Sequence, residues 1–474
     1  MSRPDRPCLT YVVSRIGGDD GVSLEAMHWM RILLRAGFTL QVVTGRVEPS
    51  QAWDRLAAHE AIDVVVLAEA DPDPGAERSQ REFRCLFEQD QVDDDFCARV
   101  RRIREALASV LDRTQSPLLV VENFTLPWHH ASLGQALAEL IQERGLAAIS
   151  RGHDFPQDRP AYRWQELGEP VRAVAQAMAI RSERVAHVAI NTRDRDTYYR
   201  DLGLGDVTVI PNAVDMDAPV FAPMAPERIA AVRRQLLGDR AGDYLALCPV
   251  RPVARKRVDV AVELVRRVAQ TSGAAPLSLV VTHDTKDAPA AVLDPLRAAA
   301  ASASVHLVFA VEQLDAKRPG ELPFDVWDLY RAADLALYFS DFEGFGNALL
   351  ECVAARLPLF VNEYEIYRRD IASVGFDLPS LSIPPAFTYD RFVAEGLAVY
   401  ERRALVGALP AELDGLAEQV QAVMAAKAPG APLPAGALRA RTERNLALVH
   451  DHFSYAVVER RLVSVIDRLL PERG

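Results

Sequence analysis

Two glutamates flank a glycine-rich turn in DFEGFGNALLECVAAR, residues 341–356. Glu343 lies in a predicted loop and Glu351 one to two turns inside the predicted helix, so we do not expect the carboxylates to meet as an acid/base pair. Separated carboxylates suit hydrogen bonds from two hydroxyl-bearing parts of one ligand, such as a sugar and a ribose. The alternative is ordinary glutamates near a helix N-terminus, which the helix dipole favours.

The glycines of this turn favour an anionic ligand. Gly344 and Gly346 allow backbone N–H groups to approach a phosphate at the N-terminus of the helix that follows. The turn, the first helical residues and the second glutamate therefore form one candidate ligand-binding set. Its members are Gly344, Phe345, Gly346, Asn347, Ala348, Leu349 and Glu351.

Two cations follow another predicted strand. Arg251 and Lys256 come just after YLALC, residues 244–248, and before a helix that begins near Val258. They suit a diphosphate, because arginine makes a forked contact and lysine acts as a point charge. The alternative is an exposed basic turn, an interpretation that fits their neighbours Arg255 and Arg257 better.

Two further stretches follow predicted strands in the first half of the chain. SRIGGDDG, residues 14–21, contains Gly17 and Gly18. They allow an anion to approach a helix N-terminus, although many such turns contain glycine merely to turn. His153 follows the predicted strand LAAIS, residues 146–150. We favour a ligand contact for His153 over the alternative of a satisfied structural histidine.

The elements that must position these residues alternate between strand and helix along the chain. Apolar runs predict strands in the first half at residues 9–14, 38–45, 61–68, 116–123, 146–150, 187–192 and 207–212. The rhythm restarts with predicted strands at residues 243–250, 276–284, 304–310, 334–340 and 357–363. This alternation predicts an α/β fold of two Rossmann-like, doubly wound domains that face a central cleft, with a ligand at the carboxyl ends of the strands.

The predicted domain boundary lies in a stretch rich in proline and alanine, MDAPVFAPMAPER, at residues 216–228. We predict an N-terminal Rossmann-like domain over residues 1–225 and a C-terminal one over 226–440. Residues 441–474 are predicted as a C-terminal helix that packs back toward the N-terminal domain.

Composition excludes several classes of protein. The 474 residues include 54 Lys and Arg and 66 Asp and Glu, a net charge of −12, which argues against broad binding of nucleic acid or anionic membranes. No run approaches the ~18 apolar residues of a membrane span, and residues 1–8 lack the apolar core of a leader. The five cysteines are scattered without a CxxC pair, which predicts reduced thiols, a cytoplasmic location and no zinc site.

One basic helix leaves two interpretations open. Residues 98–113 have apolar side chains at helical spacing, and arginines crowd the first turns. Such a helix can lie on a membrane surface. We favour the alternative of a solvated helix face, because the acidic stretch DQVDDD, residues 90–95, precedes it.

Taken together, these stretches resemble the retaining nucleotide-sugar glycosyltransferases of family 4, which have the two-domain GT-B fold. In two places the chain departs from the family pattern. Ala213 replaces the glycine of PNGVD, and the GR…KG block has Val250 and Arg257 in place of its flanking glycines. The resemblance covers most of the chain and rests on SRIGGDDG, RGHDF (151–155), VIPNAVD (209–215), RPVARK (251–256) and DFEGFGNALLECVAARLPLFV (341–361).

The resemblance implies a role for each candidate residue. Glu343 would approach the donor sugar and Glu351 would hold the ribose hydroxyls, within the donor-binding set defined above. Arg251 and Lys256 would clamp the diphosphate, and His153 would contact the donor sugar. The implied catalytic residues are His153, Glu343, Arg251 and Lys256.

Within that family, three segments are similar to enzymes that glycosylate small solutes such as glycerate derivatives, the mannosylglucosylglycerate-type synthases. The segments are VENFTLP (121–127), RGHDFPQDRPAYRW (151–164) and NEYEIYRRDI (362–371). This likeness implies basic and tyrosine contacts to an acidic acceptor, among them Arg159, although the same residues are equally consistent with a loop surface. The acceptor-side or phosphate-side residues are Gly17, Gly18, Glu122, Asn123, Arg151, Tyr162 and Arg163.

The sequence therefore predicts a retaining hexosyltransferase that uses a nucleotide diphosphate sugar, GDP-mannose or UDP-glucose, and a small, acidic hydroxyl acceptor. The nucleotide sugar is a substrate, and we expect no cofactor and no metal, because the two cations occupy the place of a metal. A GT-B-type nucleotide-sugar epimerase and a non-catalytic nucleotide-sugar-binding protein are the alternatives. The glutamate arrangement disfavours the first, and the presence of the clamp, His153 and both glutamates disfavours the second.

Overall fold

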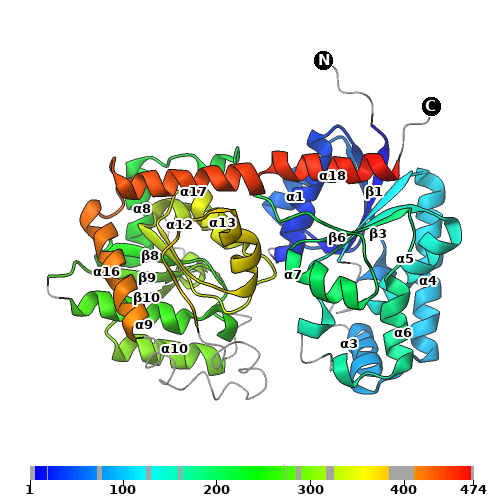
Figure 1. Ribbon diagram of the computed structural model, residues 1–474, viewed down its shortest axis with the longest axis horizontal. Helices are drawn as coiled ribbons and strands as arrows, with labels where there is room; N and C mark the ends of the chain where they lie inside the picture. The colour runs from blue at the N-terminus through cyan, green and yellow to red at the C-terminus, as the bar shows by residue number, and fades with distance from the viewer. Residues whose placement is uncertain are drawn as a thin grey trace. The chain divides into compact units, whose positions relative to one another are not determined.

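The computed structural model in Figure 1 describes residues 6–18, 20–71, 77–123, 130–158, 162, 164–271, 273–283, 290–315, 325–383 and 410–470. The chain divides into two compact units. Unit 1 comprises Met1–Ala213 with Tyr455–Gly474, and unit 2 comprises Val214–Ser454. The division after Ala213 comes earlier than the boundary between residues 225 and 226 that the sequence indicated.

The C-terminal region forms two helices where the sequence predicted one. Helix α17 (Ala437–Phe453) belongs to unit 2 and α18 (Tyr455–Leu469) to unit 1. Between them, Ser454 has an extended backbone with ψ of 161° and forms a parallel bridge with Val214. The helical pattern continues across this residue, so the break follows from the bridge and not from a local breaker residue.

Unit 1 is built around a seven-stranded parallel sheet with the order β3-β2-β1-β4-β5-β6-β7. The strands are β1 (Cys8–Ile16), β2 (Thr39–Val47), β3 (Ile62–Val66), β4 (Leu118–Glu122), β5 (Ala147–Gly152), β6 (Val185–Ala189) and β7 (Val207–Val209). The α-helices are α1 (Gly21–Arg35), α2 (Gln51–Ala57), α3 (Glu77–Phe83), α4 (Asp94–Thr114), α5 (Ala131–Arg144), α6 (Glu169–Met178), α7 (Thr192–Asp194) and α18. Each strand coincides with a predicted apolar run.

Both faces of this sheet are buried. Tyr11 of β1 belongs to a core that includes Leu462 of α18, whereas the next residue, Val12, belongs to a second core that includes Ile103 of α4. Successive strand side chains point to opposite faces, so helices on both sides require a continuous apolar run. This arrangement explains why the strands of unit 1 were visible in the sequence.

Unit 2 contains a six-stranded parallel sheet with the order β10-β9-β8-β11-β12-β13. The strands are β8 (Tyr244–Cys248), β9 (Leu277–Val281), β10 (Leu307–Phe309), β11 (Leu335–Tyr338), β12 (Leu359–Asn362) and β13 (Ser380–Leu381). The α-helices are α8 (Pro226–Leu237), α9 (Val258–Gln270), α10 (Ala290–Ser302), α11 (Ala310–Asp315), α12 (Val326–Ala332), α13 (Asn347–Ala354), α16 (Pro410–Ala426) and α17. The two-residue β13 was not predicted, because it is too short to give a periodic signal.

The predicted fold class is confirmed, since both sheets are parallel and doubly wound. In each sheet the strand order reverses at one point, between β1 and β4 in unit 1 and between β8 and β11 in unit 2. Open α/β sheets bind ligands in the crevice beyond the carboxyl ends of the strands at such a switch point. A ligand-binding site is therefore expected at the loops that follow these four strands.

The basic helix α4 is a helix with one buried and one solvated face. Its apolar residues Val100, Ile103 and Leu107 lie in the core of unit 1. Arg99 is also buried and forms an ion pair with Glu82, with 2.7 Å between nitrogen and oxygen. The interpretation of a solvated face is correct, because the apolar stripe that a membrane would need is already covered.

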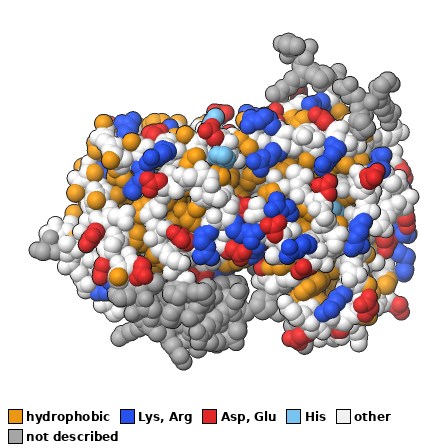
Figure 2. All heavy atoms as spheres, in the orientation of Figure 1, with side chains coloured by type: hydrophobic (Ala, Val, Ile, Leu, Met, Phe, Trp, Pro, Cys, Tyr) orange, Lys and Arg blue, Asp and Glu red, His pale blue; other side chains and the backbone are white. Residues whose placement is uncertain are grey.

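The described surface carries both signs of charge. On the face shown in Figure 2, Lys and Arg side chains lie among Asp and Glu side chains. Within the described residues, no helix is long and apolar enough to cross a membrane.

Candidate active site

Two loops that follow neighbouring central strands are tied together in unit 2. The loop after β8 leads into α9, and the loop after β11 leads into α13. The backbone N–H of Asp341 donates to the carbonyl of Arg255 at 2.8 Å, and Arg257 Nη1 lies 3.1 Å from the Asp341 carboxylate. These contacts fix the two loops together at the switch point.

Arg255 and Arg257 are not the exposed basic turn that the sequence favoured. Arg257 is 1% exposed and forms ion pairs with Asp259 and Asp341. Its φ of 51° places it in the left-handed region, at a position where the family pattern has glycine. That conformation costs a non-glycine residue about 1–2 kcal/mol, which the two ion pairs help to offset. Arg255 donates to the Phe342 carbonyl at 2.7 Å.

Glu343 receives hydrogen bonds from the loop after β8 and from the last residue of β11. Tyr338 Oη donates to Glu343 Oε1 at 2.6 Å, Lys256 Nζ contacts the same oxygen, and Arg255 Nη1 lies 3.4 Å from Oε2. Burial alone would raise the pKa of Glu343, but Lys256 and then Arg255 outweigh it and lower the value to about 2.

Lys256 is the buried counterpart of this carboxylate. Burial lowers the pKa of Lys256 to about 8, and Glu343 opposes that shift. Both members of the pair therefore remain charged near neutral pH. The arrangement provides an anion and a cation, each available to a ligand group of opposite character.

Arg251 is the exposed cation of the loop after β8. Within the described parts of the chain, its guanidinium forms no hydrogen bond and no ion pair. It follows the carboxyl end of β8, so a diphosphate at the switch point would meet it without first breaking an internal contact.

Glu351 lies on α13, on a different level from Glu343. Tyr330 Oη of α12 donates to Glu351 Oε2 at 2.8 Å, and the Tyr330 ring is 2% exposed. The Glu351 residue is half-buried. The predicted separation of the two glutamates agrees with these different environments, which make a shared proton implausible.

The N-terminus of α13 begins at a glycine that the structure requires. Gly346 has φ of 121°, and a Cβ there would lie 2.1 Å from the Tyr364 hydroxyl oxygen. The N-cap position of α13 is Gly346 itself, which has no side chain. Such an end suits an anion. The side chains of Phe345 and Leu349 are buried, so these members of the predicted set can meet a ligand only through their backbone.

A second cluster lies at the switch point of unit 1. Glu122 ends β4, and its carboxylate contacts Tyr11 Oη of β1 and His153 Nε2 after β5. Arg151 Nη1 lies 3.3 Å from the same carboxylate. Asn123 has φ of 57°, and its Oδ1 accepts the His153 backbone N–H at 3.1 Å. The predicted residues His153, Glu122 and Asn123 are therefore brought together.

Arg151 does not fit the predicted contact with an acceptor. Its side chain is 0% exposed, and Nη2 donates to Glu25 at 2.9 Å and to Asn212 at 3.0 Å. The guanidinium also lies over the Trp29 ring, 4.2 Å from its centroid. Arg151 thus supports the Glu122 carboxylate from within the protein. The Glu122 side chain, likewise 0% exposed, is enclosed by its partners.

Tyr162 is also a poor candidate for acceptor contact. Its ring is 1% exposed and packs edge-on against Phe87 at 4.4 Å and Phe83 at 5.4 Å. The aromatic core explains its presence. Arg159 and Arg163, the other basic candidates in this segment, lie outside the described residues.

The Glu48 backbone requires a glycine at position 17, and the Glu48 side chain lies against Gly18. A Cβ at Gly17 would lie 2.0 Å from the Glu48 carbonyl oxygen, and one at Gly18 would lie 2.4 Å from its carboxylate. Asp20 caps α1 by accepting the N–H groups of Val22 and Ser23, both at 3.1 Å. The carboxylates of Asp20 and Glu48 share Arg15, which lies 3.1 Å from the first and 3.7 Å from the second. The described part of the turn therefore carries more negative than positive charge, which disfavours a phosphate there and leaves a hydroxyl-bearing ligand as the better fit.

Several contacts of the site could not be found from sequence motifs. Tyr11, Tyr338 and Asn212 lie in or next to apolar runs, where each resembles an ordinary core residue or a turn residue. Only strand pairing brings Tyr11 beside Glu122, since β1 and β4 are neighbours in space. A polar side chain within a buried strand is the one available signal, and it does not name the partner.

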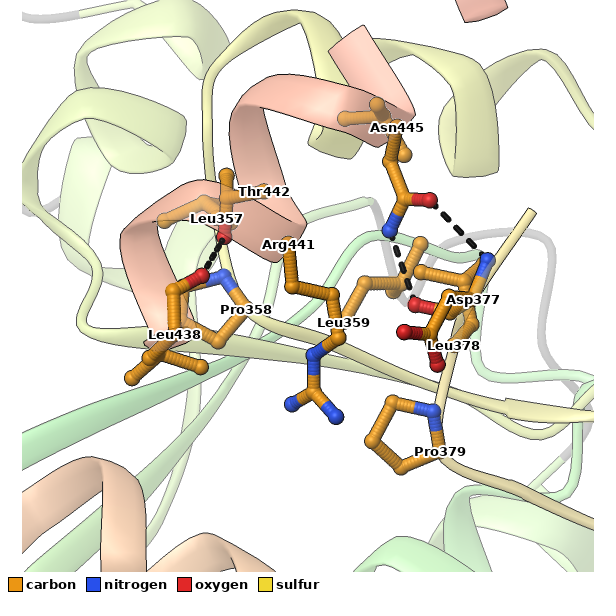
Figure 3. A pocket seen from close by; sticks show the side chains of 11 residues that line it. Leu357, Pro358, Leu359, Asp377, Leu378, Pro379, Leu438, Arg441, Thr442 and Asn445 are labelled. Carbon is orange, nitrogen blue, oxygen red and sulfur yellow. Dashed lines mark hydrogen bonds between the residues drawn. The ribbon is translucent and has the colours of Figure 1, made fainter. Parts of the chain in front are cut away.

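The pocket in Figure 3 lies elsewhere in unit 2, where the N-terminal half of α17 meets the segments around β12 and β13. Asn445 exchanges hydrogen bonds with the Asp377 backbone at 2.9 and 3.0 Å. Leu357 and Pro358 precede β12, so the pocket is at the amino end of that strand, opposite the switch-point loops. Its contacts attach α17 to unit 2.

Among the described residues, no group of three or more His, Cys, Asp or Glu side chains could hold a metal ion.

Comparison with known proteins finds no matching family model. The chain is 26% identical over 398 residues to a mannosylglucosylglycerate synthase of Thermotoga maritima, covering 79% of this chain and 84% of the relative. It is 24% identical over 384 residues to a mannosylglucosylglycerate synthase of Petrotoga mobilis, covering 77% of this chain and 85% of the relative.

Two solved structures are similar over nearly the whole chain. A glycosyltransferase from Rickettsia africae has a TM-score of 0.64 at 11% identity, covering 99% of this chain and 100% of that structure. A sucrose-phosphate synthase from Thermosynechococcus elongatus has a TM-score of 0.60 at 13% identity, covering 98% and 99%. At these identities the likeness concerns the fold, which is GT-B. Together with the two curated relatives, it supports a glycosyltransferase similar to family 4.

Proposed function

We propose that this glycosyltransferase is a retaining hexosyltransferase that acts on a nucleotide diphosphate sugar and a small, acidic hydroxyl acceptor. The observation that carries the proposal is the set of charges at the switch point of unit 2. Arg251, which is unpaired among the described residues, and the Lys256–Glu343 pair lie just beyond β8 and β11, and the N-terminus of α13 follows β11. A phosphate-bearing ligand with hydroxyl groups matches each of them.

The names of the relatives indicate which substrates to test first. A mannosylglucosylglycerate synthase makes, by its name, a product that contains mannose, glucose and glycerate. We therefore propose transfer of a mannosyl group from GDP-mannose to a glucosylglycerate-type acceptor, with UDP-glucose as the second donor. Such an acceptor carries a carboxylate and several hydroxyl groups.

In the proposed reaction, the residues of unit 2 bind the donor and stabilise the leaving group. Negative charge develops on the diphosphate as the glycosidic bond breaks, where Arg251 and Lys256 supply positive charge. Glu343 accepts sugar hydroxyls, and Glu351 accepts the ribose hydroxyls. Attack and departure on the same face of the sugar need no protein nucleophile. The two cations take the part of a metal ion, so we propose that the reaction needs none.

The test is a transfer reaction with isotopically labelled donors, run with and without glucosylglycerate. We expect a glycosylated product only when both substrates are present, and NMR of the new linkage should show the anomeric configuration of the donor. Conversion of the nucleotide sugar to an isomeric sugar without acceptor would instead identify an epimerase. Donor binding without any conversion, across a panel of acceptors, would identify a binding protein.

A further inference from the structure

The buried carboxylate of Glu122 accepts from three elements of unit 1. Tyr11 of β1 and His153 after β5 contact it directly, and Arg151 of β5 lies at 3.3 Å. Glu122 and Arg151 are also register partners on adjacent strands. No part of the Glu122 side chain is exposed, so a ligand cannot reach it. Any influence of Glu122 on a ligand must therefore pass through a neighbour.

Glu122 is held in its ionised form. Burial alone would raise its pKa, but Arg151 and the hydrogen bonds that Glu122 accepts from His153 and Tyr11 outweigh burial and lower it. An ionised carboxylate only accepts hydrogen bonds. The His153 nitrogen that contacts it, Nε2, must therefore carry a proton.

This assignment decides which ring nitrogen of His153 remains available. In the neutral imidazole one nitrogen donates and the other accepts, so a protonated Nε2 leaves a lone pair on Nδ1. Among the residues that the structure describes, none makes a hydrogen bond to Nδ1. The backbone at His153 is also fixed, because Asn123 Oδ1 accepts its N–H at 3.1 Å and the next N–H at 3.4 Å.

We propose that Glu122 is a positioning residue that acts through His153, fixing the Nε2–H tautomer and presenting Nδ1 to a ligand hydroxyl. The identity of the ligand rests on the proposed function, whereas the assignment of the tautomer does not. A hydroxyl donor of the ligand then finds an acceptor already in place. Without the carboxylate, the ring would divide its proton between both nitrogens, and only part of the population would accept at Nδ1.

The surrounding charges keep Glu122 in this role. Arg151 is shared with Glu25 of α1, and Glu25 lies 3.4 Å from His28 on the same helix. Burial would raise the pKa of Glu25, but His28 and Arg151 lower it, so two carboxylates face one buried guanidinium. Tyr11 has its pKa raised by burial and by Glu122, so it remains a donor. Arg151 faces both carboxylates, and Tyr11 and His153 also contact Glu122, so this carboxylate needs no proton of its own.

The test is ¹⁵N NMR of histidine ring nitrogens in the full chain, with the His153 signals assigned from those missing in His153→Asn. At a pH where the ring is neutral, we expect a protonated Nε2 and an unprotonated Nδ1 in the wild type. In Glu122→Gln, the two signals should move toward each other as the tautomers mix. A wild-type Nδ1–H tautomer overturns the proposal, as do unchanged His153 signals in a folded Glu122→Gln variant.

Glu82→Gln provides a matched control. Glu82 is a buried carboxylate of unit 1 that accepts from Arg99 at 2.7 Å and from Ser132 at 2.8 Å, away from His153. We expect it to lower stability as Glu122→Gln does, but to leave the His153 signals unchanged. Movement of the His153 signals in Glu82→Gln would show that a general loss of stability is enough to change the tautomer, and would overturn the proposal.

Transfer kinetics supply the separate readout for the ligand. We expect Glu122→Gln to reduce kcat/KM in proportion to the fraction of His153 that leaves the Nε2–H tautomer, about twofold for an even mixture, and Glu82→Gln to leave it unchanged. Wild-type kinetics for Glu122→Gln with mixed tautomers would overturn the role in positioning. If no donor and acceptor pair reacts with the wild type, the proposed function fails, while the NMR result still decides the tautomer.

Discussion

Removal of Glu343 should destabilise unit 2 through the buried ammonium group that it leaves behind. Glu343 is 7% exposed, and Glu343→Gln deletes the charge that Lys256 contacts. The pKa of Glu343 falls from 4.5 to about 2 in the folded protein, which corresponds to about 3 kcal/mol of stabilisation of the ionised form. The neutral amide still accepts a hydrogen bond from Tyr338, so we expect a loss of about 2–3 kcal/mol at pH 7.

The charge on Lys256 carries an unfavourable free energy of similar size in the folded protein. Burial lowers the pKa of Lys256 from 10.5 to about 8, which corresponds to about 3 kcal/mol against the charged form. The two effects nearly cancel, as expected for a buried ion pair. The double variant Lys256→Met/Glu343→Gln should therefore lie within about 1 kcal/mol of the wild type, although donor binding is lost.

The pH dependence follows from the direction of each shift. The folded pKa of Glu343 is below its unfolded value, so its stabilisation is complete above pH 4.5 and is lost as the pH falls toward about 2. The folded pKa of Lys256 is also below its unfolded value, so its cost is present below about pH 8 and disappears as the pH rises toward 10.5.

Denaturant unfolding of the full chain, followed by the transition of unit 2, measures these changes. Arg444→Ala is the control, because its ion pair with Asp377 is exposed and should contribute less than about 1 kcal/mol. A Glu343→Gln variant as stable as the wild type would refute the reasoning. A double variant less stable than Glu343→Gln would refute it as well.

Three further predictions concern the site. Glu351→Ala should weaken the binding of a bare nucleoside diphosphate by about tenfold to a hundredfold, whereas Glu343→Gln should leave that affinity nearly intact while turnover falls. Calorimetry that shows the reverse pattern would contradict this division of roles. His153→Ala should reduce the transfer rate at least about tenfold, while the free energy of unfolding falls by roughly 1–3 kcal/mol. Full activity or global unfolding of this variant would show that His153 has a structural role. Turnover should persist with a chelator, and its loss with recovery on adding Mg²⁺ or Mn²⁺ would show a metal requirement.

Much of the fold could be predicted because its signals are local. Strands such as Leu118–Glu122 and Tyr244–Cys248 are buried on both faces, so their apolar runs are continuous. The break at Ser454 was missed because it depends on pairing with Val214, which is distant in sequence.

The candidate site was predictable in part, for the same reason. Arg251, Lys256 and Glu343 follow strands at the switch point, where strand ends can be located from sequence. Which cation is exposed could not be predicted, because it depends on the carboxylates that face each one. Arg257 is buried and pairs with Asp341 and Asp259, whereas Arg251 has no such partner among the described residues. The sequence assigned Arg151 to an acceptor contact because its actual partners, Glu25 and Asn212, are distant in sequence and cannot be identified from it.

The measurement that tests the account most directly is calorimetric titration of Arg251→Ala with a nucleoside and with its diphosphate. Arg251 is exposed at the carboxyl end of β8, so the variant should fold normally. We expect the diphosphate to bind about tenfold to a hundredfold more weakly than to the wild type, with the nucleoside unchanged. Equal losses for both ligands, or wild-type affinity for the diphosphate, would contradict a phosphate clamp at this switch point.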